Sequence, residues 1–289
     1  MLIEKAIGDA YGACFEYMPN DYVEQHNILS GYPQHPVLNI KPGRYTDDTQ
    51  MALALTEVLV SDKPWNKRVI ADQIVECFKR DPREGYTSGL YQLLQEVESG
   101  KELLSRIVPS SDSSGAAMRS APLGIISTMD EVMEKTKIHA SISHNTEMGI
   151  KSAQAVALAS HYIFYGIGPK SRLGGFLSEK LLYNFDEPWQ GVVGRKSWMC
   201  VKAVITALKN SNSMSELLKE VVAFTGDTDT VAAVALAIGA HSDEIEQDLP
   251  KALVDGLEKD DYGYDYLKEM NNKLMMLSGR GPVTVSQVS

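Results

Sequence analysis

The spacing of apolar residues constrains this chain more than any other feature, because it is helical along almost the whole length. Apolar residues recur at intervals of three and four in residues 2–11 and again in residues 51–59. Similar runs cover residues 66–79, 87–98, 115–128, 146–166, 171–183, 197–209, 214–223, 230–240, 244–258 and 261–277. No stretch shows the alternation of β-branched or aromatic residues that indicates a strand. The sequence therefore predicts an all-α fold.

No internal repeat, linker or block of charge divides the chain, so we expect residues 1–289 to form one compact multi-helix domain. The longest stretch without periodicity is about 19–46, which contains four prolines. A connection of that length inside a domain is more often functional than incidental. This stretch is therefore a candidate functional segment, and the sequence leaves open whether it folds over a site.

The charge balance and the cysteines exclude several classes of protein. The chain carries 28 basic and 38 acidic residues, a net charge of −10, so it lacks the basic surface of a non-specific nucleic-acid-binding protein. No apolar stretch is long enough for a membrane span. Glu4 and Asp9 fall where a signal peptide would be apolar. Cys14, Cys77 and Cys200 form no CxxC pair, which argues against a disulfide framework or a zinc site. We expect a cytoplasmic protein.

Two acidic clusters precede unusually apolar helices, one in residues 45–50 (YTDDTQ) and one in residues 226–230 (GDTDT). Each could simply cap its helix, because Thr and Asp accept backbone N–H groups at a helix N-terminus. One capping residue suffices, however, and two carboxylates within three positions repel each other. The helices that follow are too apolar for the surface, so the carboxylates should point inward and need a partner. Arg44 could serve the first cluster, but a divalent cation would serve both.

The ligand chemistry favours a hard cation. Oxygen ligands from Asp and Thr select Mg²⁺, or Mn²⁺, over zinc. Four carboxylates are more than one Mg²⁺ usually takes, and they suit two ions about 3.5–4 Å apart. Neither cluster has the spacing of an EF-hand loop.

With these motifs the chain resembles the ADP-ribosylglycohydrolase family, which includes the dinitrogenase reductase-activating glycohydrolases and the animal ADP-ribosyl hydrolases. The segments that carry the resemblance follow the family order along nearly the whole chain. They are AIGDAYGA with Phe15-Glu16 (residues 6–16), TDDTQM (46–51), SGAAMR with APLG (114–124), Ser143-His144, and GDTDT (226–230). The two Asp/Thr motifs are the specific ones.

The resemblance implies a helical fold with a dinuclear Mg²⁺ (or Mn²⁺) centre that cleaves ADP-ribose from modified targets. It implies that the metals are held by Thr46, Asp47, Asp48, Asp227, Asp229 and Thr230. Glu16 would lie near the reacting ribose as the catalytic carboxylate, with Asp47 or Asp48 as the second choice. Ser114, Gly115, Ala116 and Met118 would contact the diphosphate and its ribose, and His144 would contact the ADP-ribose.

Each supporting residue also has a purely structural interpretation, which the sequence leaves open. Glu16 could be a solvated helix end, His144 a buried structural histidine, Ser114 an N-cap and Met118 part of the core. The chain also departs from the family pattern at three positions: Thr225 and Leu236 stand where the family has Gly, and Val231 where Asn is common. These changes should affect helix packing more than ligand binding.

The leading hypothesis is a metal-dependent hydrolase that cleaves the N- or O-glycosidic bond between ADP-ribose and a protein side chain, through an oxocarbenium-like transition state. A second hypothesis keeps the site but assigns a small ADP-ribosyl compound or a modified nucleic acid as substrate. A third is a non-catalytic relative that binds ADP-ribose or has a structural role. Retention of all six proposed ligands argues against the third.

Overall fold

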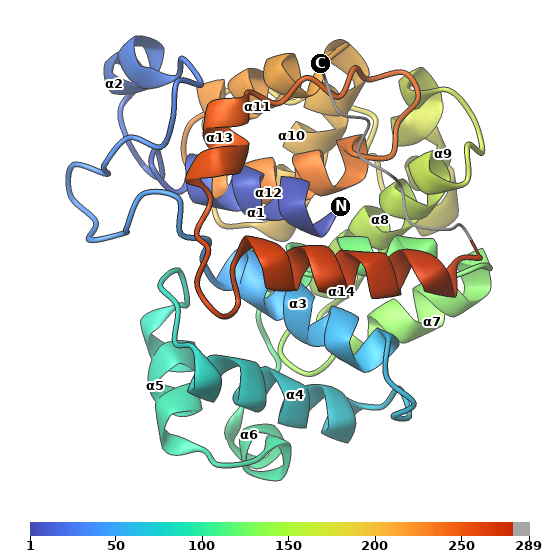
Figure 1. The fold of residues 1–289 in the computed structure, drawn as a ribbon. Coiled ribbons are helices and arrows are strands. Elements are labelled where there is room, and N and C mark those ends of the chain that lie inside the picture. The colour runs from blue at the N-terminus through green and yellow to red at the C-terminus, as the bar shows by residue number, and fades with distance from the viewer. Residues whose placement is uncertain (280–289) are drawn as a thin grey trace.

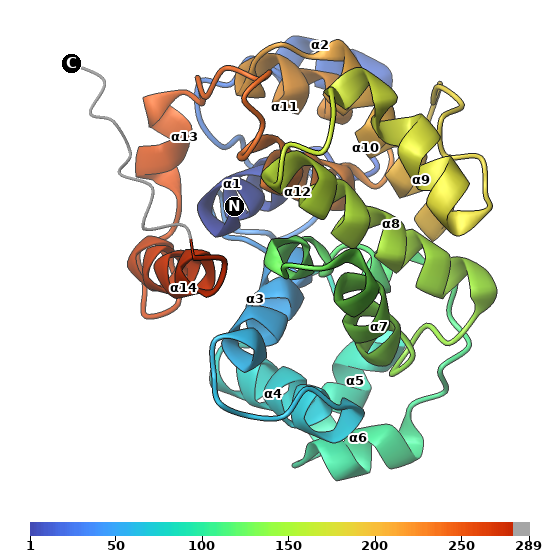
Figure 2. The same ribbon diagram turned by 90° about the vertical axis from the view of Figure 1, so that its right-hand side faces the viewer.

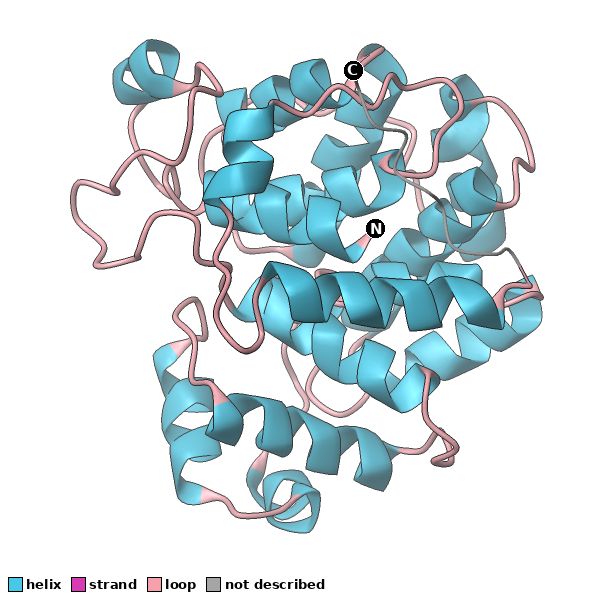
Figure 3. Cartoon of the chain, in the orientation of Figure 1, coloured by secondary structure: helices cyan, strands magenta, loops and turns pink. Residues whose placement is uncertain are grey.

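The computed structural model describes residues 1–279, which fold into helices joined by loops (Figure 1, Figure 3). The α-helices are α1 (Leu2–Gly12), α2 (Asn20–His26), α3 (Asp47–Leu59), α4 (Lys67–Arg80), α5 (Ser88–Glu96), α6 (Gly100–Arg106), α7 (Met129–Ala140), α8 (Glu147–Phe164), α9 (Leu173–Leu181), α10 (Ser197–Asn210), α11 (Met214–Ala223), α12 (Thr228–Gly239), α13 (Lys251–Gly256) and α14 (Tyr264–Leu277). Three short 3-10 helices are η1 (Ser114–Ala116), η2 (Ala121–Ile125) and η3 (Lys170–Arg172). Within residues 1–279 β-type pairing is limited to isolated bridges. The predicted all-α fold is confirmed.

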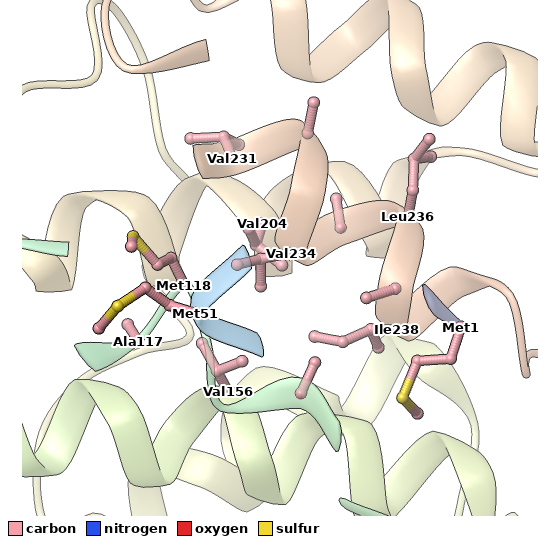
Figure 4. Packing of buried hydrophobic residues seen from close by; sticks show 14 of the residues in the cluster. Met1, Met51, Ala117, Met118, Val156, Val204, Val231, Val234, Leu236 and Ile238 are labelled. Atoms are coloured by element: carbon pink, nitrogen blue, oxygen red, sulfur yellow. The ribbon is translucent and has the colours of Figure 1, made fainter. Parts of the chain in front are cut away.

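Helix α12 lies at the centre of the core. Every one of its residues is buried, and it packs against α1, α8, α10 and α11. Its valines and leucine belong to the main hydrophobic cluster, together with Met51 of α3 and Met118 (Figure 4). The small side chains of Ala232, Ala233, Ala235 and Ala237 let the surrounding helices approach it closely.

Helix α1 packs on α12 through two glycines spaced one turn apart. A Cβ atom on Gly8 would lie 2.4 Å from the carbonyl oxygen of Ala232, and one on Gly12 would lie 2.5 Å from that of Thr228. The Thr228 hydroxyl donates a hydrogen bond to the Gly12 carbonyl oxygen at 2.8 Å. The two helix backbones are therefore in direct contact, which no larger side chain at these positions would allow.

The remaining helices surround this pair. Figures 1 and 2 place α4, α5 and α6 together at one end of the molecule, and α2, α10 and α11 at the other. Helix α3 lies between them, packed against α4, α14 and α1. The N-termini of α3 and α12 are thus both next to the C-terminal half of α1, where the acidic clusters meet.

Several expected elements differ from the structure. The predicted run at 115–128 is not an α-helix but η1 and η2, because the Pro122 ring opens a new short helix and Ser120 bonds back to the carbonyl of Ala116. The run at 244–258 shortens to α13, which follows Pro250. The stretch 19–46 contains α2. Of the predicted 1–289 domain, residues 280–289 lie outside the described residues.

Within residues 1–279, none of the helices has the length and continuous apolar character needed to cross a bilayer.

The α1–α12 contact predicts an unusual response to substitution at Gly8. Gly→Ala inside a helix normally stabilises by about 1 kcal/mol, but here the added methyl would meet the Ala232 carbonyl. We expect Gly8→Ala to lower the free energy of unfolding by about 1–3 kcal/mol, measured by urea denaturation. Gly89→Ala in α5 is the matched control, because a Cβ there meets nothing within 4 Å. A Gly8→Ala protein as stable as the control would contradict the close packing.

Candidate active site

The two acidic clusters meet on one wall of a cavity of about 690 Å³. Asp47 and Asp48 reach it from the start of α3, Asp227 and Asp229 from the start of α12, and Glu16 from the turn after α1. The four aspartates are buried, as predicted from the apolar character of their helices, and Glu16 is half-buried. A volume of this size suits a nucleotide-sized ligand.

Asp9 of α1 organises the first cluster, although the sequence analysis gave it no role. Its two carboxylate oxygens accept hydrogen bonds from the Thr46 backbone N–H (3.0 and 3.1 Å), the Thr46 hydroxyl (2.8 Å) and the Thr49 backbone N–H (2.8 Å). Asp9 therefore caps the N-terminus of α3 from another helix. The available signal was an ionisable residue placed between Gly8 and Ala10, in the second half of a helix that has no other charged residue after Lys5.

Asp47 is held from the opposite side by the loop before α5. Its backbone N–H donates to the Glu84 carbonyl oxygen at 3.0 Å. Gly85 has φ +98°, and a Cβ there would lie 2.0 Å from Asp47 Oδ1, so only glycine lets this loop approach the carboxylate. The loop thereby closes one side of the cavity.

Hydrogen bonds link the second cluster to the first and to the neighbouring loop. The Thr230 hydroxyl donates to Asp48 Oδ2 at 3.3 Å, and the Ser114 hydroxyl donates to Asp227 Oδ2 at 3.1 Å. Carboxylate oxygens of Glu16, Asp227 and Asp229 all lie within 4.8 Å of one another. These three carboxylates come from two separate segments, the turn after α1 and the start of α12, and they converge on one point.

The electrostatics of this wall are unfavourable without a cation. The pKa values of Asp47, Asp48 and Asp229 are raised well above the usual carboxyl range. Burial is the larger cause, and repulsion from neighbouring carboxylates is the smaller one. Burial and the Asp227 charge raise the pKa of Glu16 to about 7. Lys5, buried on α1, supplies a positive charge nearby, but its ammonium group donates to the Met118 carbonyl oxygen at 2.7 Å.

The donor set fits a divalent cation. Asp48 Oδ1 is buried and has no hydrogen-bond partner among residues 1–279, which is costly unless another group approaches it. The Thr46 hydroxyl gives its proton to Asp9 and keeps a lone pair. An all-oxygen set of this kind could bind a hard metal ion.

The loop at 111–119 and His144 form the adjoining wall. His144 is buried, with Nδ1 2.7 Å from the Ser143 hydroxyl and Nε2 3.1 Å from the Ser113 hydroxyl. Burial and the Arg119 charge lower the pKa of His144 to about 3, so the ring is neutral at physiological pH. Arg119, itself buried, donates to the carbonyl oxygen of Gly115 and to the Ser143 hydroxyl. It therefore ties the predicted substrate loop to the histidine.

Most of the predicted site residues share this cavity. Those that line it are Glu16, Asp47, Asp48, Ser114, Gly115, Met118, His144, Asp227, Asp229 and Thr230. Thr46 lies behind the wall on Asp9, and Ala116 packs with Ala140 and Ala153 instead. Gly115 and Ala116 lie in η1, so the α-helix expected to open there is absent.

The 19–46 stretch contributes no residue to the cavity lining and supports Glu16 from behind. His35 Nδ1 accepts the backbone N–H groups of Val37 and Leu38 at 3.0 and 2.8 Å. Its Nε2 must then carry the proton, and it donates to the Glu16 carbonyl oxygen at 3.0 Å. No sequence signal separated His35 from the other histidines.

A family model for ADP-ribosylglycohydrolase matches residues 1–282. The chain belongs to the ADP-ribosylglycohydrolase family. This is a family of hydrolases acting on ADP-ribose, and the resemblance seen in the motifs is confirmed.

Three relatives show the range of ADP-ribosylglycohydrolases that the chain resembles. It is 24% identical to the ADP-ribosylarginine hydrolase Tri1 of Pseudomonas putida, over 81% of this chain and 67% of the relative. It is 27% identical to the ADP-ribosylhydrolase ARH3 of Mus musculus, over 63% of this chain and 51% of the relative, about half of that protein's length. It is 24% identical to the ADP-ribosyl-dinitrogen reductase glycohydrolase of Rhodospirillum rubrum, over 80% of each.

A solved structure titled "ADP-ribosylglycohydrolase-related protein complex" superposes with a TM-score of 0.74 at 21% identity, covering 96% of this chain and 95% of that one. At this identity the likeness concerns the fold, and the ADP-ribosylglycohydrolase fold is therefore shown.

The three departures from the ADP-ribosylglycohydrolase pattern fall in packing positions, as expected. Val231 and Leu236 are fully buried in α12. Thr225 adopts φ +60°, a left-handed conformation that explains why glycine is usual there. None of the three contributes to the cavity wall.

The raised carboxyl pKa values predict how the metal-free protein responds to pH. A carboxyl whose pKa is higher in the folded than in the unfolded state stabilises the fold below its unfolded pKa, and this stability is lost as pH rises through the folded pKa. In excess chelator we expect these carboxyl groups to make the free energy of unfolding fall as pH rises from about 5 toward the folded pKa of Glu16, about 7.

Asp229→Asn should reduce this slope, by up to about 1.4 kcal/mol per pH unit, in urea titrations at each pH. Asp243→Asn, at an exposed position, is the control. If the free energy of unfolding changes equally with pH in Asp229→Asn and in the native chain, the Asp229 carboxyl is not a source of the pH dependence.

Proposed function

We propose that this protein is a divalent-metal-dependent hydrolase that releases ADP-ribose from a modified protein side chain. The observation that supports this most is the convergence of four buried aspartates and Glu16 at one nucleotide-sized cavity. The relatives are named as hydrolases of ADP-ribosylated targets, which agrees with this proposal. We propose Mg²⁺, or Mn²⁺, as the metal, with two ions bound.

In this proposal Asp47, Asp48, Asp227, Asp229, Thr46 and Thr230 hold the metal ions. When bound, such ions would attract the vicinal hydroxyls of the ribose and lower the pKa of a bound water. The Asp9 carboxylate, bonded to Thr46 and Thr49, keeps the start of α3 in position for this role. Because the ligands come from two helix N-termini that α1 holds together, the distance between the two clusters is set by the core.

Glu16 is proposed to act on the reacting bond. It lines the cavity next to Asp227 and Asp229, and His35 fixes its backbone. A half-buried carboxylate at this point can take the proton of an attacking water and return it to the departing group. Ser114, Gly115, Met118 and His144 form the wall that would contact the rest of ADP-ribose. The serine hydroxyls and backbone groups there suit a diphosphate, which the acidic wall would otherwise repel.

The metal proposal predicts the effect of Asp229→Asn. Removing one anionic ligand should weaken Mg²⁺ binding at least about tenfold, and binding of ADP-ribose in the presence of Mg²⁺ should weaken with it. Isothermal titration calorimetry measures both affinities and the number of ions, which we expect to be two. Asp243→Asn should match the native chain. Unchanged binding in Asp229→Asn would contradict the metal site.

The catalytic proposal predicts that Glu16→Gln lowers turnover by about 10²–10⁴-fold while Mg²⁺ and ADP-ribose still bind. The measurement is release of free ADP-ribose from defined serine-, glutamate- and arginine-linked peptides. Glu24→Gln on the exposed face of α2 is the control. Full activity of Glu16→Gln would exclude the assigned role, and binding without turnover by the native chain would favour a non-catalytic ADP-ribose-binding protein.

A further inference from the structure

The rim of the cavity beside Glu16 is formed by Tyr17 and Arg195. Both side chains line the cavity and both are exposed, Tyr17 by 48%. Arg195 Nε donates to the Tyr17 hydroxyl at 3.3 Å, and its guanidinium carbon lies 5.8 Å from the centre of the Tyr17 ring. The other exposed lining residues come from the loop before α5 and from the α5–α6 end; they are Gly85, Thr87, Ser88, Gly89, Arg106 and Val108.

The backbone holds both residues against the acidic wall. The Arg195 carbonyl oxygen accepts the backbone N–H of Ser114 at 3.1 Å, and the neighbouring Val193 exchanges backbone hydrogen bonds with the 225–227 loop. Tyr17 has φ +53°, rare for an aromatic residue, and its N–H donates to the Gly226 carbonyl oxygen at 2.9 Å. A strained residue held this firmly at a site points to a functional constraint.

Arg195 differs from the neighbouring cations because its charge is not neutralised by an ion pair with a carboxylate. Lys196 forms an ion pair with Asp112 at 2.6 Å, and Arg106 pairs with Glu96. Within residues 1–279 Arg195 has no carboxylate at ion-pair distance. The charges that it influences are those of Glu16 and Asp227, which places it on the side where the bond is cut.

We propose that Arg195, positioned by Tyr17, makes this site select ADP-ribose linked through an acceptor oxygen, on a serine hydroxyl or an acidic side chain, over ADP-ribose linked to an arginine guanidinium. The inference rests on the function proposed above and names its substrate class. An acceptor side chain that belongs to a protein must reach the cavity through an open part of its rim. The part of the rim next to Glu16 is the one that Tyr17 and Arg195 form.

The preference follows from charge. A guanidinium acceptor is a cation and would lie against the Arg195 guanidinium, while the Tyr17 ring that could receive it is already occupied by Arg195. With two divalent ions bound, the charge of the four aspartates would be balanced, so they would no longer offset this repulsion. An acceptor oxygen carries no such charge and gains negative charge as it departs, which Arg195 can stabilise by donating a hydrogen bond.

Hydrolysis of this bond balances without a further reactant. The bond between the anomeric carbon and the acceptor oxygen breaks, and a water oxygen bonds to that carbon. One water proton stays on the new sugar hydroxyl, and the other passes to the acceptor oxygen, which leaves as an alcohol or a carboxylic acid.

The test compares three peptides of matched sequence that carry ADP-ribose on serine, glutamate or arginine, with the Mg²⁺-loaded protein. We expect kcat/KM for at least one oxygen-linked peptide to exceed that for the arginine-linked peptide by at least about tenfold. Arg195→Glu should reduce this ratio by at least about tenfold, chiefly by raising kcat/KM for the arginine-linked peptide. The faster of the two oxygen-linked peptides identifies a hydroxyl or a carboxylate acceptor.

Matched variants separate charge from structure. Arg195→Lys should keep the ratio within about threefold, Arg195→Gln should lower it, and Lys196→Gln on the same loop should leave it unchanged. Melting temperature and ADP-ribose affinity by calorimetry verify that each variant is folded and binds. An active native protein that prefers the arginine-linked peptide, or a ratio unchanged in Arg195→Glu, overturns this inference and leaves the hydrolase function standing. Turnover of none of the three peptides overturns both.

Discussion

The burial of like charges is the interaction on which the rest of this structure depends. Four aspartates and the half-buried Glu16 share one wall, with the buried Asp9 behind it, and each carboxylate loses hydration and repels its neighbours. The Asp9 carboxylate is stabilised because it accepts hydrogen bonds from backbone N–H groups at the start of α3, which have no partner within that helix. Asp48, Asp227 and Asp229 accept hydrogen bonds from the Thr230 hydroxyl, the Ser114 hydroxyl and the Thr230 backbone N–H, and none of these donors carries a positive charge. This residual negative charge is what makes a divalent cation the natural partner of the wall.

The core keeps these charges together against their repulsion. Gly8 and Gly12 let the backbone of α1 touch that of α12, and the alanines of α12 let the other helices approach as closely. Because Asp9 lies between the two glycines and Glu16 follows them, the same contact that builds the core sets the position of both carboxylates. Hydrophobic burial of α12 on all sides supplies the stabilisation that offsets the local electrostatic cost.

The capping and metal-site interpretations of the acidic clusters turn out to be compatible. Thr46 does cap α3, since its hydroxyl accepts the Asp48 N–H at 3.4 Å, yet the aspartates beside it face the cavity. One expected helix is absent for a local reason, and one long connection has a role that only a tertiary contact shows. Residues 115–128 have helical spacing but are interrupted at Pro122, and the 19–46 stretch supports Glu16 through His35 without covering the site.

The sequence by itself determined the helical class, the family and the two Asp/Thr motifs, because periodicity and short motifs are local properties of the chain. Only the tertiary structure decided that Asp9 supports α3, that His35 holds Glu16, and that Arg195 lies on Tyr17 at the rim. Each of these contacts joins residues 19 to 178 positions apart in the chain. Such pairings arise from how α1 and α12 pack, and a single sequence carries no local signal for them.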